Sequence, residues 1–176
     1  MKWGRFTHAK RTGVAGLLPL RHLGPVLLER DFDVAFRGTF DFTLDAKNRL
    51  TVPAKFRAAL ADGVVLARGS GRCVEMWPAA DFEASTDRAL GDLNPLSQRG
   101  KELKRRLFAA TFDTELDAAG RVMLPAKLIE HAALARDVSV LGTGEWLEVW
   151  DRDTWAAEDE DSPDRINELT SHFDHP

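Results

Sequence analysis

Short runs of alternating apolar and polar residues fill the middle of the chain, and their spacing predicts strands with only short helices between them. The run 36–44 is rich in Phe and Thr, which favour extended backbone, and 50–52 continues the pattern after a turn. Pro53 lacks a backbone donor and suits the first turn of a helix that we expect to reach about Leu60. Two more strands are expected at 64–67 and 73–77, joined by a hairpin around Gly69-Ser-Gly71.

The same pattern occurs twice, because Phe40–Phe56 aligns without gaps onto Phe112–Leu128. The offset is 72 residues, and 9 of the 17 positions are identical. A second block follows at an offset of 73, where Glu75-Met-Trp77 matches Glu148-Val-Trp150. We interpret this as a tandem duplication and expect one body with a pseudo-two-fold axis, since neither copy is large enough to close its own core. Matching strands are expected at 138–141 and 146–150, around a turn at Gly142-Thr-Gly144.

The duplication divides the chain into five expected segments. They are an N-terminal extension at 1–34, a first repeat at 38–82, a connecting helical segment at 83–110, a second repeat at 111–155 and an acidic tail at 156–176. The extension matches neither copy, and we expect it to be disordered or to reflect a true start at Val34. Helices are predicted at Pro95–Phe108, whose polar positions are basic, and within the tail at 163–169.

Charge is unevenly distributed along the chain. The net charge of −4 comes from residues 151–176, which hold nine acids against two bases, while residues 1–34 carry a net +3 and residues 35–150 are balanced. This total argues against a protein that coats nucleic acid but leaves room for a local basic face. The single cysteine, Cys73, excludes an internal disulfide framework and fits a reducing cytosol. We expect a cytoplasmic protein without a membrane span.

The candidate chemistry is a turn with the pattern Asp-x-x-x-Arg, present once in each copy. Aspartate bonds the backbone of its own turn, so Asp45 and Asp117 are assigned to structuring it. Asn48 and Gly120 are assigned to the positive-φ position that both turns require. The arginines that end the turns pair with these acids or contact a ligand, and the pattern alone leaves both interpretations open.

A two-stranded ribbon with basic residues at its base fits the major groove of DNA, and arginine grips phosphate or a guanine edge with two parallel hydrogen bonds. The predicted DNA contacts are Lys47, Arg49, Lys55, Arg57, Arg121 and Lys127. No cofactor and no metal site are predicted, and the protein is not expected to be an enzyme.

The motifs resemble one family of bacterial regulators. Phe36-Arg-Gly-Thr39, Leu44-Asp-Ala-Lys-Asn-Arg-Leu-Thr-Val-Pro-Ala-Lys-Phe-Arg57 and Glu75-Met-Trp-Pro78 are similar to the first half of the MraZ family pattern. Glu115–Pro125 and Leu141–Asp151 are similar to its second half, so the resemblance covers about 35–155. Two positions depart from the pattern: Asn48 stands where the family has glycine, and Ala119 stands where the first copy has Lys47.

This resemblance implies an α+β fold, namely a tandem swapped-hairpin β-barrel of the AbrB/SpoVT type with short helices. It also implies assembly into a homo-oligomeric ring and localisation in the cytoplasm at the nucleoid. The implied partner is double-stranded DNA, bound at short direct repeats upstream of the protein's own operon, in the division and cell-wall gene cluster. Because Ala119 replaces the lysine of the first copy, the first turn is expected to carry more of the DNA contact.

The sequence also suggests three other interpretations. Paired Asp45 and Asp117 across a pseudo-dyad resemble an acid-protease site, but the Thr or Ser and Gly that follow aspartate in such sites are missing. The five histidines lack ligand spacing, except for a near-terminal pair that solvation explains. The main alternative is a ring-forming or antitoxin-like module that binds protein rather than DNA.

Overall fold

Five elements build the first copy, in the part of the chain that the computed structural model describes: residues 35–91, 93–160 and 170. They are β1 (Phe36–Thr43), β2 (Arg49–Thr51), the 3-10 helix η1 (Ala54–Phe56), β3 (Val64–Arg68) and β4 (Cys73–Pro78). The second copy repeats this order with β5 (Phe112–Thr114), β6 (Arg121–Met123), α3 (Ala126–Ala132), β7 (Asp137–Gly144) and β8 (Leu147–Asp151). The predicted N-terminal extension and the predicted helix at 163–169 lie outside the described residues.

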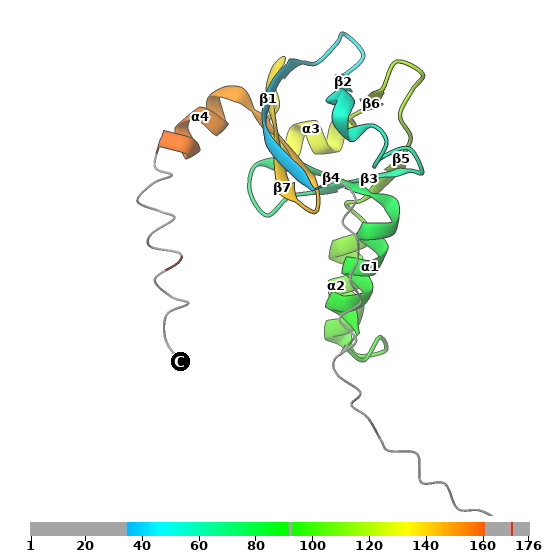
Figure 1. Cartoon of the computed structure of the whole chain (residues 1–176). Helices are drawn as coiled ribbons and strands as arrows, with labels where there is room; N and C mark the ends of the chain where they lie inside the picture. Colours follow the sequence, from blue (N-terminus) through cyan, green and yellow to red (C-terminus); the bar gives the residue numbers. More distant parts are fainter. Residues whose placement is uncertain (1–34, 92, 161–169, 171–176) are drawn as a thin grey trace, which may run out of the picture. The chain divides into compact units, whose positions relative to one another are not determined.

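Three further helices follow the hairpins (Figure 1). They are α1 (Ala79–Leu90), α2 (Gln98–Phe108) and α4 (Arg152–Glu160). In chain order α1 follows β4 just as α4 follows β8, so these two helices are counterparts, whereas α2 belongs to the connection between the copies. The described residues contain no helix long and apolar enough to cross a membrane.

The strands of the two copies pair with each other. One antiparallel sheet has the order β1-β7-β8-β4-β3-β5, and a second sheet consists of β2 and β6. The counterparts of β1, β2, β3 and β4 are β5, β6, β7 and β8. When each strand is replaced by its counterpart, the β1–β7 pair becomes β5–β3 and the β3–β4 hairpin becomes β7–β8. The β2–β6 and β4–β8 pairs each contain two counterparts and stay the same. The pairing pattern therefore keeps the symmetry of the duplicated sequence, and the expected mixed α+β fold is confirmed at that level.

The core lies between the β2–β6 pair and the inner face of the six-stranded sheet. Leu50 and Val122, which are directly opposite each other in that pair, are completely buried. Both copies supply further members of the same cluster, among them Phe36, Val52, Phe56, Leu60, Leu66, Met76, Leu124, Leu128, Leu147 and Val149. Burying this apolar surface is the main favourable contribution to folding, and it requires both copies at once.

Two expectations about the repeats need correction. The helix predicted from Pro53 to about Leu60 is only a 3-10 turn at Ala54–Phe56, because its backbone bonds span three residues: Phe56 N–H donates to Pro53 O and Leu60 N–H to Arg57 O. The turn predicted at Gly142-Thr-Gly144 is instead the end of β7, which stays paired with β1 up to Phe36.

The helices also differ from the prediction at their ends. The helix predicted from Pro95 begins at Gln98, because the Ser97 hydroxyl accepts a hydrogen bond from Gly100 N–H at 3.0 Å and caps it there. Helix α4 occupies part of the expected tail. Its first turn is held by Asp151, whose carboxylate accepts a hydrogen bond from Thr154 N–H at 3.2 Å.

Candidate functional site

The turn between β1 and β2 is held by its own aspartate. One oxygen of Asp45, Oδ1, accepts hydrogen bonds from the N–H groups of Lys47 at 2.8 Å and Arg49 at 3.0 Å. Asp45 O also accepts a bond from Asn48 N–H at 2.9 Å. Asn48 has a φ of 58°, the left-handed conformation that asparagine tolerates better than most residues. The aspartate therefore fixes the backbone that presents Lys47 and Arg49.

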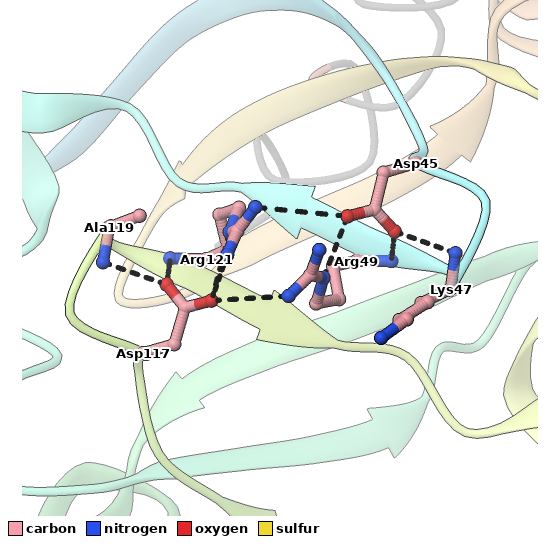
Figure 2. Close-up of polar contacts among 6 residues, drawn as sticks. All are labelled: Asp45, Lys47, Arg49, Asp117, Ala119 and Arg121. Carbon is pink, nitrogen blue, oxygen red and sulfur yellow. Dashed lines mark hydrogen bonds and ion pairs between the residues drawn. The ribbon is translucent and has the colours of Figure 1, made fainter.

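The turn between β5 and β6 has the same construction. Asp117 Oδ1 accepts bonds from Ala119 N–H at 2.9 Å and Arg121 N–H at 3.0 Å. Gly120 N–H donates to Asp117 O at 2.8 Å, and Gly120 has a φ of 72°. The duplicated sequence thus forms two equivalent turns, one at each end of the β2–β6 pair (Figure 2).

The four charged side chains of these turns form one cluster, shown in Figure 2. Arg49 Nε donates to Asp45 Oδ2 at 2.7 Å, and Arg121 Nε donates to Asp117 Oδ2 at 2.8 Å. Arg121 Nη2 also forms an ion pair with Asp117 Oδ2 at 2.7 Å. Weaker ion pairs cross between the copies, Arg49 Nη1 to Asp117 Oδ2 at 3.8 Å and Arg121 Nη1 to Asp45 Oδ2 at 3.9 Å. The cluster is formally neutral and links the two turns.

The contacts of the cluster favour the charged forms of Asp45, Asp117 and Arg121. The hydrogen bond from the Arg121 side chain lowers the pKa of Asp117 to about 2, and the same contact raises the pKa of Arg121. The backbone hydrogen bond from Arg49 is the main cause that lowers the pKa of Asp45. Both aspartates are therefore ionised at neutral pH, so the paired carboxylates do not share a proton as those of acid proteases do.

The arginines are oriented by these contacts but keep part of their surface in solvent. About 27% of the Arg49 side chain and 32% of the Arg121 side chain are exposed. Lys47 lies on the exposed tip of the first turn, where the second turn has Ala119. Two partly exposed guanidinium groups and one lysine thus lie along one short two-stranded ribbon.

The other predicted contacts occupy different surroundings. Lys55 is exposed and tied to β1: its ammonium donates to Arg37 O at 3.0 Å and lies 4.5 Å from the ring centre of Phe40. Arg57 Nε donates to Val52 O at 3.0 Å, and its side chain lies against Gly120 of the second turn. Lys127 is exposed on α3. Arg57 thus lies beside the cluster, whereas Lys55 contacts the first strand and the ring of Phe56 in η1.

Two residues near the turns were not predicted from the sequence. Arg136 is exposed, and it lines a hollow together with Asp45 and Asn48 of the first turn. Met123 is 56% exposed and lies directly opposite Arg49 in the β2–β6 pair. Arg136 lies between the two aligned blocks of the second copy, so the duplication gave no signal for it. An exposed methionine in a strand becomes conspicuous only once the partner strand is known.

Comparison with known proteins gives a consistent result. The chain matches the family described as "MraZ protein, putative antitoxin-like" over residues 35–102 and 107–169. A protein of Micrococcus luteus named Transcriptional regulator MraZ is 42% identical over 121 residues, which cover 68% of this chain and 83% of the relative. The protein of the same name from Limosilactobacillus fermentum is 34% identical over 139 residues, covering 79% of this chain and 96% of the relative. That of Salinispora arenicola is 40% identical over 130 residues, covering 72% and 90%.

Proposed function

The chain belongs to the MraZ family, and on that premise we propose that it regulates transcription by binding double-stranded DNA through its two Asp-x-x-x-Arg turns. The observation that carries the proposal is the β2–β6 ribbon, which presents Arg49 and Arg121 in equivalent, pre-oriented positions. A guanidinium held by an aspartate loses little side-chain entropy on binding, so its remaining N–H groups are available at low cost to phosphate or a base edge.

The finer proposal covers assembly and target. We propose that the interleaved strand pairing corresponds to a swapped-hairpin barrel of the AbrB/SpoVT type, and that the chains form a closed ring. Such a ring meets short direct repeats upstream of its own operon, in the division and cell-wall gene cluster. One turn alone holds DNA weakly, because the positive charge of its arginine is already balanced by its aspartate. Turns that are linked in one assembly bind at a high effective concentration. Affinity is then expected to fall steeply with salt.

The test is binding to the DNA upstream of the protein's own gene, measured by fluorescence anisotropy across a salt series. Arg49→Ala is expected to abolish specific binding while mass and circular dichroism stay unchanged. Lys47→Ala, which removes an exposed charge, should weaken binding to all sequences and reduce the salt slope by about one for each phosphate that the protein no longer neutralises. Arg88→Ala, on helix α1, removes one exposed charge away from the turns; it is the control and is expected to leave the sequence preference unchanged.

A second variant distinguishes a direct DNA contact by Arg49 from a role of Arg49 in shaping the turn. Asp45→Asn keeps the shape of the turn but weakens the orientation of Arg49, so it should retain more affinity than Arg49→Ala. Equal losses in the two variants would mean that Arg49 only shapes the turn. Unchanged binding in Arg49→Ala would contradict the proposal.

One observation favours a second candidate function. The four charges of the Asp–Arg cluster cancel, so the ribbon is less positive than its two arginines suggest. A neutral cluster of this kind also suits a protein partner, as in an antitoxin-like interaction module. The same salt series decides between the two, because a protein-binding module shows neither sequence preference nor a steep salt slope with upstream DNA.

A further inference from the structure

The register of the β2–β6 ribbon defines its outward face. Residues directly opposite each other in an antiparallel pair share a face, as do residues two apart in one strand. Leu50 and Val122 are opposite each other and completely buried, so they mark the inner face. The outer face therefore consists of the four remaining residues of the ribbon: Arg49, Thr51, Arg121 and Met123.

Met123 lies next to both arginines on this face. It is directly opposite Arg49 and two residues along β6 from Arg121. Cross-strand neighbours have Cβ atoms about 5 Å apart, and residues two apart in a strand are separated by about 6.6 Å. A ligand that contacts both guanidinium groups consequently covers the Met123 side chain, which is 56% exposed.

The two copies differ at this position. The aligned residue of the first copy is Thr51, which has the equivalent place beside the arginines but a small polar side chain. Among the described residues, Met123 is the one exposed large apolar side chain that lies in a strand. The other three lie in α2 or just before it: Leu96, Leu103 and Phe108. The arginines of the ribbon are thus equivalent, whereas the residues beside them are not.

The thioether side chain suits one chemical feature of the major groove. Arginine reads hydrogen-bonding groups on base edges, whereas the 5-methyl group of thymine is an apolar feature of the same groove. Methionine has no N–H or O–H group to donate in its side chain, and it is flexible enough to pack on a small apolar group. A methionine between two arginines therefore fits a base sequence that presents a thymine methyl group beside the groups that arginine reads.

We propose that Met123 contacts the 5-methyl group of a thymine in the major groove, one or two base pairs from the one nearest to Arg49. The spacing follows from the cross-strand distance of about 5 Å, compared with a rise of about 3.4 Å for each base pair. The inference rests on the proposed binding of DNA through the ribbon, and it adds a residue that selects sequence by an apolar contact. Because Thr51 is the residue opposite Arg121, the two halves of the ribbon are expected to prefer different bases.

The test uses uracil, which pairs like thymine but lacks the methyl group. Each thymine of the upstream DNA is replaced in turn, and binding of the full chain is measured by fluorescence anisotropy at one salt concentration. For the original chain, at least one replacement is expected to weaken binding about threefold to fivefold, because one buried methyl contact is lost. Met123→Gln, which keeps the approximate length of the side chain, is expected to bind the thymine and uracil fragments equally.

Two variants control for other effects of the substitution. Met123→Leu keeps an apolar side chain and is expected to retain the preference for thymine. Leu96→Gln makes the same apolar-to-polar change at a position that is 78% exposed and outside the ribbon, and it is expected to behave like the original chain. Circular dichroism and mass are expected to be the same for all four chains.

Each outcome bears on the inference. Equal binding of Met123→Gln to both fragments, with a thymine preference in Met123→Leu, supports it. A thymine preference that persists in Met123→Gln overturns it, because another residue then contacts the methyl group. A changed mass of Met123→Gln overturns it too, because it assigns Met123 to a contact between copies. An original chain that binds upstream DNA regardless of every uracil replacement overturns it but leaves the proposed regulator intact, whereas one that does not bind this DNA contradicts both.

Discussion

The two turns show how one backbone requirement is met by different residues. Position 48 and position 120 both adopt positive φ, but asparagine occupies the first and glycine the second. A Cβ at Gly120 would meet the side chain of Arg57, whereas the aligned partner of Arg57 is Ile129, which lies with Asn48 around a hollow. Glycine is therefore needed at position 120 for two reasons: the backbone has a positive φ, and the side chain of Arg57 leaves no room for a Cβ. At position 48 only the positive φ restricts the residue, and asparagine tolerates it.

Gly120→Ala is expected to lower the free energy of unfolding by about 1–3 kcal/mol, because a Cβ is strained at this φ and displaces Arg57. Asn48→Gly is the control, since it keeps the favourable conformation, and its effect should stay within about 1 kcal/mol. Urea unfolding followed by tryptophan fluorescence measures both. Equal stability of Gly120→Ala and the original chain would show that Arg57 does not occupy that space in solution.

At the scale of elements, the β4–β8 pair places two acids directly opposite each other. Glu75 faces Glu148, and the indole N–H groups of Trp77 and Trp150 donate to them at 3.0 and 2.9 Å. Burial raises the pKa of Glu75, and the charge of Glu148 raises it further. Strand β4 belongs to the first copy and β8 to the second, so Glu75 and Glu148 face each other where the two copies meet. When both acids are charged, their repulsion destabilises the contact between the copies.

Glu75→Gln is accordingly expected to raise the free energy of unfolding by about 0.5–1 kcal/mol at neutral pH. The amide oxygen still accepts the indole bond of Trp77, but the charge repulsion is gone. The gain should disappear in acid, where Glu75 is protonated and uncharged in the original chain too. Glu83→Gln, on an exposed face of α1, is the control and should change little. Thermal unfolding at several pH values measures the effect, and a gain independent of pH would argue against repulsion.

The sequence predicted the strands of each copy better than the way they extend and pair. Alternation and turn residues located β1 to β4 nearly to their ends, because these signals are local. The extension of β7 through Gly142 and Gly144 was missed, since it follows from pairing with β1 of the other copy. Residues 156–160 of helix α4 were expected in the acidic tail, although Asp151, which holds the first turn of the helix, was a local signal for it.

The site was predictable in composition but not in geometry. The duplication identified both Asp-x-x-x-Arg turns, and it also raised the possibility that each arginine pairs with its own aspartate. The crossed contacts between the copies, such as Arg49 to Asp117, depend on the β2–β6 pairing, which no local pattern specifies. Arg57 against Gly120 likewise needs the two copies to be in place. The DNA contacts of Lys47 and the arginines stay a prediction.

At the scale of the whole molecule, the Asp–Arg cluster is expected to make the stability of the folded chain depend on pH. The pKa of Asp117 falls from its ordinary value of 3.8 to about 2 in the folded chain, mainly through the Arg121 hydrogen bond. A carboxyl whose pKa is lowered by folding stabilises the folded state at pH values above its unfolded pKa. That contribution is lost as the pH falls through the folded pKa. For Asp117 the loss is expected between about pH 4 and pH 2.

Asp117→Asn isolates this contribution. The variant should be less stable than the original chain at pH 7, because the amide cannot form the charged hydrogen bonds with Arg121. Between pH 4 and pH 2 its stability should fall less steeply, since one titrating carboxyl is gone, although Asp45 and Asp151, whose pKa values are also lowered, still contribute. Urea midpoints at half-unit steps of pH compare the two chains. Parallel curves would mean that protonation of Asp117 is not linked to folding.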